Sequence, residues 1–321
     1  MAEICVFSIQ AYQQLGDKIT QLGGWQRGSV EVEHFPDGER YQRVITPVLG
    51  KHVICLGGTL DDACTLELFD LANELANEAR SLTLVIPYFG YSTMERRVKP
   101  GEIVTAKARA RLLSAIPQAD LGNHIVFIDL HAAGIPHYLE GGIRHTHLYA
   151  KEAIKEMCHQ LCGHDFVLAS TDSGRAAWVE SLANEMGVGM SFVFKQRLSG
   201  AATQVKAVQA LVDGRKVIIY DDMIRTGGSL LTAARAYLEC GATEIHVVAS
   251  HGLFPGEALQ RIQSSGLIQT VGVTDTHPRV HQLSRPCLRV TSVAPLLVEH
   301  LKQSLQNEEP THASPRSRRS P

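Results

Sequence analysis

Short apolar runs rich in Val and Ile alternate along this chain with longer segments of helical periodicity, and no other feature constrains its fold as strongly. Strands that alternate with helices are typical of an α/β fold built on a mainly parallel sheet flanked by helices. The expected strands are Ile4–Ser8, Val30–His34, Tyr41–Ile45, His52–Leu56, Leu82–Ile86, Ile125–Asp129, Phe166–Ala169, Phe192–Phe194, Val217–Tyr220 and Glu244–Ala249. The expected helices are Thr65–Arg80, Thr105–Ile116, His147–Leu161, Ala176–Met186 and Ser229–Glu239.

Two of these strands run into acidic residues, one at Asp129 and the other at Asp221 and Asp222. Ligands of open α/β sheets bind beyond the carboxyl ends of the strands, so each strand end is a candidate site. A chain of 321 residues is long enough for two domains, and one domain per site predicts domains over residues 1–150 and 151–292. We expect a helix over residues 293–306 and a disordered tail over residues 307–321, which lack an apolar anchor.

The composition excludes several classes of protein. A hydrophobic content of 44%, a charged content of 20% and a net charge of −2 give no general attraction to nucleic acid or membrane. Seven irregularly spaced cysteines do not form a disulfide framework, and Cys158, Cys162 and His164 lack the second pair expected of a structural metal cluster. The apolar run Ile4–Ile9 is too short for a signal peptide or a membrane span. We therefore expect a cytoplasmic protein.

The strongest functional signal runs from Val217 to Ser229, where a buried strand is followed by two adjacent acids and then by a glycine-rich turn that opens a helix. Carboxylates can accept hydrogen bonds from the vicinal hydroxyls of a sugar, and backbone N–H groups at a helix N-terminus bind phosphate. A strand end with a tight turn and a serine N-cap explains the glycines but leaves the paired acids unexplained. The pattern predicts a ribose 5-phosphate site at Asp221, Asp222, Arg225, Thr226, Gly227, Gly228 and Ser229.

This motif resembles the phosphoribosyl pyrophosphate loop of type I phosphoribosyltransferases, and further segments make the chain similar to the ribose-phosphate pyrophosphokinase family. These segments are Phe35-Pro-Asp37-Gly-Glu39, Pro87-Tyr-Phe-Gly-Tyr91, Thr105-Ala-Lys107, Asp129-Leu-His131-Ala, Ser170-Thr-Asp172-Ser-Gly174, Lys195-Gln-Arg197 and Ser250-His-Gly-Leu-Phe254. The resemblance implies two phosphoribosyltransferase-like domains. It also implies transfer of the pyrophosphoryl group of ATP, or another nucleoside triphosphate, to the 1-hydroxyl of ribose 5-phosphate.

The resemblance implies that the nucleotide side of the site lies in the first domain. In the family, the segment with Phe35, Asp37 and Glu39 reaches across a subunit contact to hold the adenine, which implies a homo-oligomer. Taken alone, that segment favours a turn between two strands. The further nucleotide candidates are Arg96, Arg97 and His131.

Metal and catalytic residues are also implied by the resemblance. His131, Asp129 and Asp172 are the candidates for Mg²⁺, which needs few protein ligands when substrate phosphates complete its shell. Asp172 is also a candidate for the sugar site. Lys195 and Arg197 precede a weakly patterned stretch and are expected on a mobile catalytic loop that closes over the triphosphate.

The chain departs from the usual family pattern at two places. Thr93, Met94 and Glu95 align with an Arg-Gln-Asp triplet that binds nucleotide, and Arg225 replaces an acid of the sugar phosphate loop. Both departures resemble the plant-type class II enzymes. Three functions stay open: the synthetase, a phosphoribosyltransferase and a catalytically silent associated subunit. The two-domain length disfavours the transferase, and retention of the catalytic, metal and sugar candidates disfavours the silent subunit.

Overall fold

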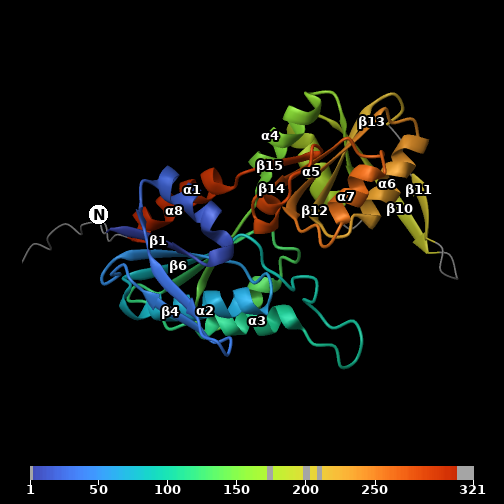
Figure 1. Ribbon diagram of the computed structural model, residues 1–321. Helices are drawn as coiled ribbons and strands as arrows, with labels where there is room; N and C mark the ends of the chain where they lie inside the picture. Colours follow the sequence, from blue (N-terminus) through green and yellow to red (C-terminus); the bar gives the residue numbers. More distant parts are fainter. Residues whose placement is uncertain (1–2, 172–175, 198–202, 208–211, 309–321) are drawn as a thin grey trace, which may run out of the picture. The chain divides into compact units, whose positions relative to one another are not determined.

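The chain divides into two compact units. In Figure 1 the colours follow the sequence of the whole chain, from blue at the N-terminus to red at the C-terminus. The computed structural model describes residues 3–171, 176–197, 203–207 and 212–308. Unit 1 comprises Met1–His147 together with Ala294–Pro321, and unit 2 comprises Leu148–Val293. The last helix, α8 (Ala294–Glu308), therefore belongs to unit 1, where it contacts α1 (Gln13–Gly23). The tail expected from residue 307 lies outside the described residues from residue 309 on.

Unit 1 is built on a sheet with the strand order β2-β1-β5-β6-β7-β8. Its central strands β5, β6 and β7 are buried along their whole length, as expected of parallel strands covered on both faces. A separate antiparallel hairpin is formed by β3 and β4. The strands are β1 (Ile4–Ser8), β2 (Gln26–Arg27), β3 (Val30–His34), β4 (Arg40–Val44), β5 (His52–Leu56), β6 (Ser81–Ile86), β7 (Asn123–Ile128) and β8 (Arg144–Leu148), and the helices after β5 and β6 are α2 (Asp62–Glu78) and α3 (Thr105–Ser114).

Unit 2 has the strand order β11-β10-β9-β12-β13-β14-β15. All pairs are parallel except the hairpin of β10 and β11. The strands are β9 (Val167–Ser170), β10 (Gly189–Arg197), β11 (Thr203–Ala207), β12 (Lys216–Ile224), β13 (Glu244–Gly252), β14 (Thr270–Thr274) and β15 (Leu288–Thr291). The helices are α4 (Lys151–Cys162), α5 (Ala176–Met186), α6 (Gly228–Glu239) and α7 (Ala258–Ser264).

The two units repeat one topology. If the hairpin of β3 and β4 in unit 1 and the strand β11 in unit 2 are set aside, the six remaining strands of each unit lie in the order second, first, third, fourth, fifth, sixth along its own stretch of chain. The strands set aside lie between the second and third of these strands along the chain, as the separate hairpin of β3 and β4 in unit 1 and as β11, the hairpin partner of β10, in unit 2. The loop after β5 is consequently the counterpart of the loop after β12, although the two loops share no sequence motif.

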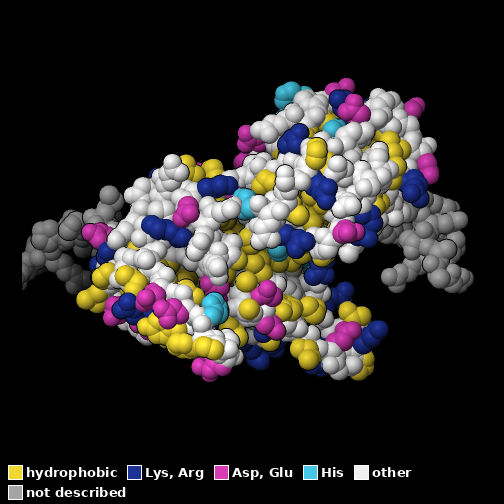
Figure 2. Space-filling view, viewed as in Figure 1, with side chains coloured by type: hydrophobic (Ala, Val, Ile, Leu, Met, Phe, Trp, Pro, Cys, Tyr) yellow, Lys and Arg dark blue, Asp and Glu magenta, His cyan; other side chains and the backbone are white. Residues whose placement is uncertain are grey.

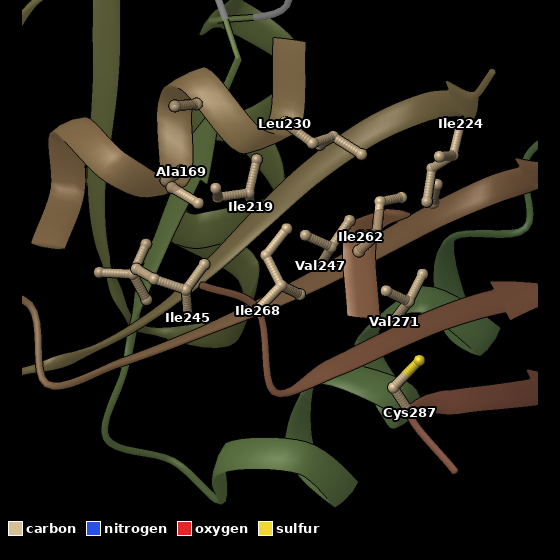
Figure 3. Close-up of a cluster of buried hydrophobic side chains, with 14 of the residues drawn as sticks. Ala169, Ile219, Ile224, Leu230, Ile245, Val247, Ile262, Ile268, Val271 and Cys287 are labelled. Atoms are coloured by element: carbon tan, nitrogen blue, oxygen red, sulfur yellow. The ribbon is translucent and has the colours of Figure 1, made fainter. Parts of the chain in front are cut away.

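The hydrophobic core of unit 2 covers both faces of its sheet. On one face Ile219 and Val247 pack against Leu230 of α6 and Ile262 of α7, as Figure 3 shows. On the other face Tyr220 packs with residues of α4 and α5. Neighbouring residues of β12 thus enter opposite core clusters because successive strand side chains point to opposite faces.

The expected α/β fold is confirmed, but several elements have other bounds than expected, and others, such as β2 and α7, were not expected. β12 continues to Ile224 instead of ending at Tyr220, and β10 continues to Arg197 instead of ending at Phe194, because each is paired with a neighbouring strand over the added residues. The helix expected from His147 begins at Lys151, since Arg144–Leu148 forms β8. Within the described residues, no helix is both long enough and apolar enough to cross a membrane.

Replacement of Ile219 by Ala tests the core of unit 2. Ile219 is fully buried, so we expect the free energy of unfolding to fall by about 2–5 kcal/mol. Val290→Ala on β15 is the control, because its side chain is 40% exposed and its loss should change that free energy by less than about 1 kcal/mol. Urea unfolding followed by circular dichroism measures both values, and equal losses would contradict the packing described.

Candidate active site

The loop from β12 to α6 is the best-defined candidate site in unit 2. Asp221 and Asp222 lie within β12, where Asp221 is paired with Ala249 of β13. The sequence prediction that both acids follow the strand is therefore wrong, because the parallel pairing with β13 extends as far as Ile224. The described pairing with β9 on the other side ends at Tyr220, so the acids lie where β12 extends beyond β9.

The two acids have different environments. Asp222 is buried with an exposure of 4%, whereas Asp221 is partly exposed. The carboxylate of Asp221 accepts hydrogen bonds from the Thr171 hydroxyl (3.3 Å) and from the backbone N–H of Asp222 (2.9 Å). Asp221 is thus the acid better placed to bind a ligand, whereas the Asp222 side chain is buried in the fold.

The glycine turn prepares the N-terminus of α6. Gly227 is the N-cap residue with φ +77°, and no side chain at the cap bonds to the first N–H groups of the helix. The alternative of a serine N-cap is therefore wrong. A Cβ atom at Gly227 would lie 2.7 Å from Ile262, and Arg261 donates a hydrogen bond to the Thr226 carbonyl at 3.0 Å. A helix N-terminus with this opening is suited to a phosphate.

The other candidates of unit 2 are only partly described. Lys195 and Arg197 lie on β10, opposite Val205 and Thr203 of the antiparallel partner β11. We expected both residues to follow a strand, and this prediction is wrong, because the backbone of both is part of β10. The structure does not describe their side chains, and Asp172 lies outside the described residues.

In unit 1, Asp129 and His131 follow the end of β7. Asp129 is 5% exposed and has φ +41°, a left-handed conformation that is uncommon for residues other than glycine. His131 is partly exposed, and the N–H of the intervening Leu130 donates to Nε2 of His147 at 2.8 Å. The loop therefore presents a nearly buried carboxylate and an accessible imidazole at the carboxyl end of a parallel strand.

The segment with Phe35, Asp37 and Glu39 is the turn of the β3–β4 hairpin. The N–H of Phe35 donates to the Glu39 carbonyl (2.8 Å), and the Asp37 carboxylate accepts from the N–H of Glu39 (3.1 Å). The turn expected from the sequence alone is thus confirmed. Phe35 is 46% exposed, with its ring 6.3 Å from that of Tyr41, so an aromatic face is available to a ligand or a second subunit.

Arg96 and Arg97 lie in the segment between β6 and α3. Arg97 donates through Nε to the Glu102 carbonyl at 3.0 Å, and Arg96 pairs with Glu95 at 3.3 Å. The Glu102 carboxylate accepts the N–H groups of Lys99 and Val98, and these bonds hold its pKa below the usual value. Arg97 is consequently tied into a turn, whereas Arg96 is 77% exposed and reaches solvent.

The chemistry of these residues fits a metal that takes few protein ligands. No group of three or more His, Cys, Asp and Glu side chains able to hold a metal ion occurs in the part of the chain that is described. Mg²⁺ takes one or two carboxylates and completes its shell with water and phosphate oxygens, so a sparse set is adequate for it. Burial raises the pKa of Cys158 to about 12 and that of Cys162 to about 11, which opposes the thiolate form that binds metals.

Two residues that shape the loop from β12 to α6 were not predicted from the sequence. Thr171 bonds to Asp221, and Arg261 fixes the carbonyl of Thr226. Both contacts join residues distant in the chain, so no local pattern marks them. Thr171 lies in the segment Ser170-Thr-Asp172, which carries part of the family resemblance. Its place in that segment was the only feature of the sequence that could have indicated a role in the site.

The repeated sheets and the loop after β12 define the class as an α/β protein with two phosphoribosyltransferase-like units. Two family models match the chain: the N-terminal domain of ribose phosphate pyrophosphokinase over residues 4–116 and the phosphoribosyl synthetase-associated domain over residues 191–312. The solved phosphoribosylpyrophosphate synthetase from Mycobacterium smegmatis has a TM-score of 0.84 at 27% identity, over 95% of this chain and 99% of that chain.

Curated relatives extend the match along the chain. The ribose-phosphate pyrophosphokinase of Rhodopirellula baltica is 30% identical over 311 residues, which cover 94% of this chain and 96% of the relative. The ribose-phosphate pyrophosphokinase of a Nostoc species is 32% identical over 299 residues, which cover 92% and 88%. The chain therefore belongs to the ribose-phosphate pyrophosphokinase family.

Two adjacent glycines provide a test of the loop conformation. Gly227→Ala places a side chain at a positive φ and against Ile262, so we expect the free energy of unfolding to fall by about 1–3 kcal/mol. Gly228→Ala is the matched control, because a Cβ there meets only the Thr226 hydroxyl at 3.9 Å, and it should be neutral or slightly stabilising. Equal stabilities of the two variants in urea unfolding would contradict the left-handed cap.

Proposed function

We propose that this chain is a ribose-phosphate diphosphokinase, which transfers the pyrophosphoryl group of ATP or another nucleoside triphosphate to ribose 5-phosphate. The products are phosphoribosyl pyrophosphate and, from ATP, AMP. The observation that carries the proposal is the loop that joins Asp221 on β12 to the uncapped N-terminus of α6, in a chain that belongs to this family. The reaction class of the family and the chemistry of the loop agree.

The sugar phosphate is proposed to bind along this loop. The 5-phosphate lies against the N–H groups from Thr226 to Ser229, where the partial positive charge of the helix N-terminus favours an anion. The ribose hydroxyls donate to Asp221, with Asp222 and Asp172 as the other acceptors. This arrangement leaves the 1-hydroxyl as the reactive end of the ligand.

The transfer itself is proposed to depend on Lys195 and Arg197. The oxygen of the 1-hydroxyl forms a bond to the β-phosphorus, the bond from that phosphorus to the oxygen bridging the α-phosphorus breaks, and AMP leaves with the bridging oxygen. The proton of the 1-hydroxyl passes to water in the same exchange. Negative charge moves onto the leaving AMP, and cations close to it lower the barrier.

A magnesium ion is proposed as the metal of the reaction, held by His131 and Asp129 of unit 1 together with phosphate oxygens. Asp172 lies outside the described residues and remains a candidate ligand from the family resemblance alone. When bound, the ion neutralises charge on the triphosphate. The near burial of Asp129 and its left-handed backbone support a role for this carboxylate beyond packing. Asp129 and His131 belong to one loop, which can therefore present both groups to the same nucleotide.

The nucleotide is proposed to bind in unit 1, against Arg96, Arg97 and His131. Phe35, Asp37 and Glu39 of a neighbouring subunit complete the adenine site, and the exposed Phe35 ring supports this role. The enzyme is accordingly proposed to be a homo-oligomer. The cysteines of the described residues are all free thiols, which supports a reducing, cytoplasmic location.

Release of AMP from ATP tests the proposed function. We expect release that requires both ribose 5-phosphate and Mg²⁺, with phosphoribosyl pyrophosphate formed in equal amount. A catalytically silent partner of such an enzyme is the second candidate, because residues 191–312 match a model described as a synthetase-associated domain. No release with any nucleoside triphosphate would refute the synthetase and favour that candidate.

Lys195→Ala and Arg197→Ala should lower turnover far more than they weaken ribose 5-phosphate binding. Each cation is expected to act mainly on charge that develops in the transition state, an effect of about 3 kcal/mol or more per group. Steady-state kinetics give kcat, and calorimetry gives the Kd of ribose 5-phosphate. Unchanged kcat in both variants would remove these residues from the mechanism.

Discrimination between nucleoside triphosphates should be weak. Thr93 and Met94 replace the Arg and Gln of the usual nucleotide triplet, and apolar contacts distinguish bases poorly compared with buried polar groups. Met94 is 38% exposed and offers only such a contact. We expect kcat/KM with GTP or CTP to lie within about tenfold of the value with ATP, and a preference for ATP above about a thousandfold would contradict this.

A further inference from the structure

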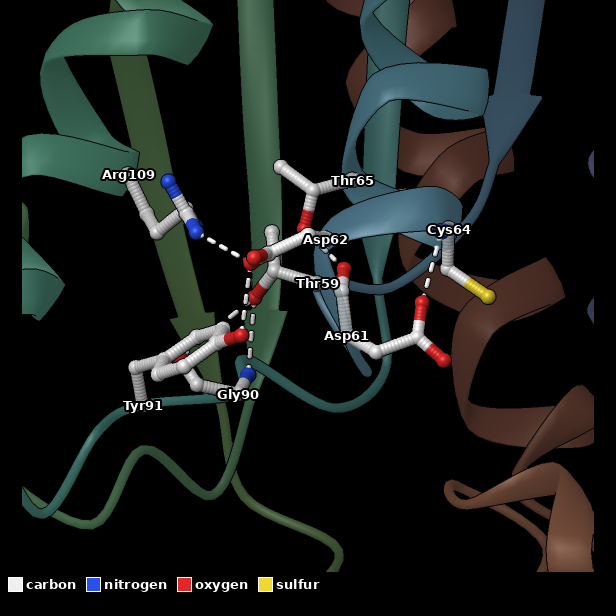
Figure 4. Close-up of polar contacts among 8 residues, drawn as sticks. All are labelled: Thr59, Asp61, Asp62, Cys64, Thr65, Gly90, Tyr91 and Arg109. Carbon is white, nitrogen blue, oxygen red and sulfur yellow. Dashed lines mark hydrogen bonds and ion pairs between the residues drawn. The ribbon is translucent and has the colours of Figure 1, made fainter.

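A polar cluster joins three segments of unit 1 at the carboxyl ends of β5 and β6 (Figure 4). Asp62 is the first residue of α2, Tyr91 lies in the turn after β6, and Arg109 is on α3. One carboxylate oxygen of Asp62 accepts hydrogen bonds from the Tyr91 hydroxyl (2.7 Å) and from Nη2 of Arg109. The Arg109 guanidinium also lies over the Tyr91 ring, 4.9 Å from its centroid. We refer to these three residues as the Asp62 cluster.

The backbone beside the cluster is held in an uncommon conformation. Tyr91 has φ +61°, in the left-handed region that bulky residues rarely adopt. The preceding Gly90 donates its N–H to the Thr59 hydroxyl at 2.7 Å, and a Cβ at Gly90 would lie 1.9 Å from the Thr59 carbonyl oxygen. Such a conformation persists only when its surroundings hold it, and Asp62 supplies one of the contacts that do so.

The cluster directly precedes residues 92–97, which carry the proposed nucleotide-binding arginines. The N–H of Met94 donates to the Tyr91 carbonyl at 2.9 Å, and the Tyr138 hydroxyl donates to the Glu95 carbonyl at 2.6 Å. The start of this segment is therefore anchored to Tyr91 at one point and to Tyr138 at another. A change in the orientation of Tyr91 would be passed to the residues that follow.

Stability alone is a poor explanation for the cluster. The Asp62 side chain is 73% exposed, and exposed ion pairs contribute little to folding because water screens them. Two donors that converge on one oxygen nevertheless fix the direction of both side chains. The hydrogen bond from Tyr91 holds the pKa of Asp62 below its usual value and that of Tyr91 above it, so the carboxylate stays ionised and the phenol stays protonated at neutral pH.

We propose that Asp62 is a positioning residue for nucleotide binding: it orients Tyr91 and Arg109 and thereby holds residues 92–97 in the conformation that receives a nucleoside triphosphate. This inference rests on the proposed function, because it takes residues 92–97 as part of the nucleotide site. Asp62 itself need not touch the nucleotide. Its loss should therefore affect nucleotide binding and leave the ribose 5-phosphate site of unit 2 intact.

The test compares Asp62→Ala, Tyr91→Phe and the double variant with the wild type. We expect Asp62→Ala to raise the KM for ATP about tenfold, with kcat at saturating ATP and the KM for ribose 5-phosphate changed by less than about twofold. Because both residues act through one hydrogen bond, the double variant should bind ATP no more weakly than Asp62→Ala alone. Calorimetry with α,β-methylene-ATP measures the same loss independently of turnover.

Glu140→Gln is the matched control. Glu140 pairs with Arg111, also on α3, at 2.7 Å, and its side chain is 57% exposed. This variant should leave both KM values unchanged. Equal analogue affinity of Asp62→Ala and wild type, or a parallel rise in both KM values with a lower Tm, would overturn the inference while the proposed function stands. A wild type that neither releases AMP nor binds the analogue would overturn both.

Discussion

The parallel pairing of β12 with β13 is the constraint on which the loop from β12 to α6, the proposed sugar phosphate site, depends. It continues through Asp221 to Ile224, past the point where the described pairing with β9 ends. Hydrogen bonds to β13 therefore fix the backbone of the acids, and Thr171 after β9 can reach the Asp221 carboxylate. Because only Arg225, Thr226 and Gly227 separate β12 from α6, the position of the helix N-terminus follows from the same pairing.

The two units share one topology and differ in how the equivalent helix begins. In unit 1, α2 has Asp61 as its N-cap, and the Asp61 carboxylate accepts the N–H of Cys64 at 2.8 Å. A carboxylate in this position satisfies an N–H group and repels a second anion. In unit 2 the cap of α6 is Gly227, which brings no side chain. In the same fold, the N-terminus of α6 after β12 is thus open to a phosphate, whereas the Asp61 carboxylate occupies the N-terminus of α2 after β5.

Much of the fold follows from local sequence signals. The strands Ile4–Ser8 and His52–Leu56 and the helix Ala176–Met186 were expected with the bounds that the structure has, because continuous apolar runs and helical periodicity are strong signals. Short or polar elements such as α7 and β2 lack these signals and were missed. The paired acids and glycines of the proposed sugar phosphate site could also be predicted, since they form one continuous segment of chain.

The sequence by itself determined the α/β class, the family and the residue types of the loop from β12 to α6, because local periodicity or a contiguous motif indicates each of them. Only the tertiary structure decided that Asp221 and Asp222 lie within a strand, that Gly227 is the helix cap, and that Asp62 and Arg109 meet at Tyr91. The physical reason is that strand pairing, cap geometry and convergent hydrogen bonds join residues far apart in the chain. The energy of these interactions depends on how close the residues lie in the folded chain, which a local sequence pattern does not indicate.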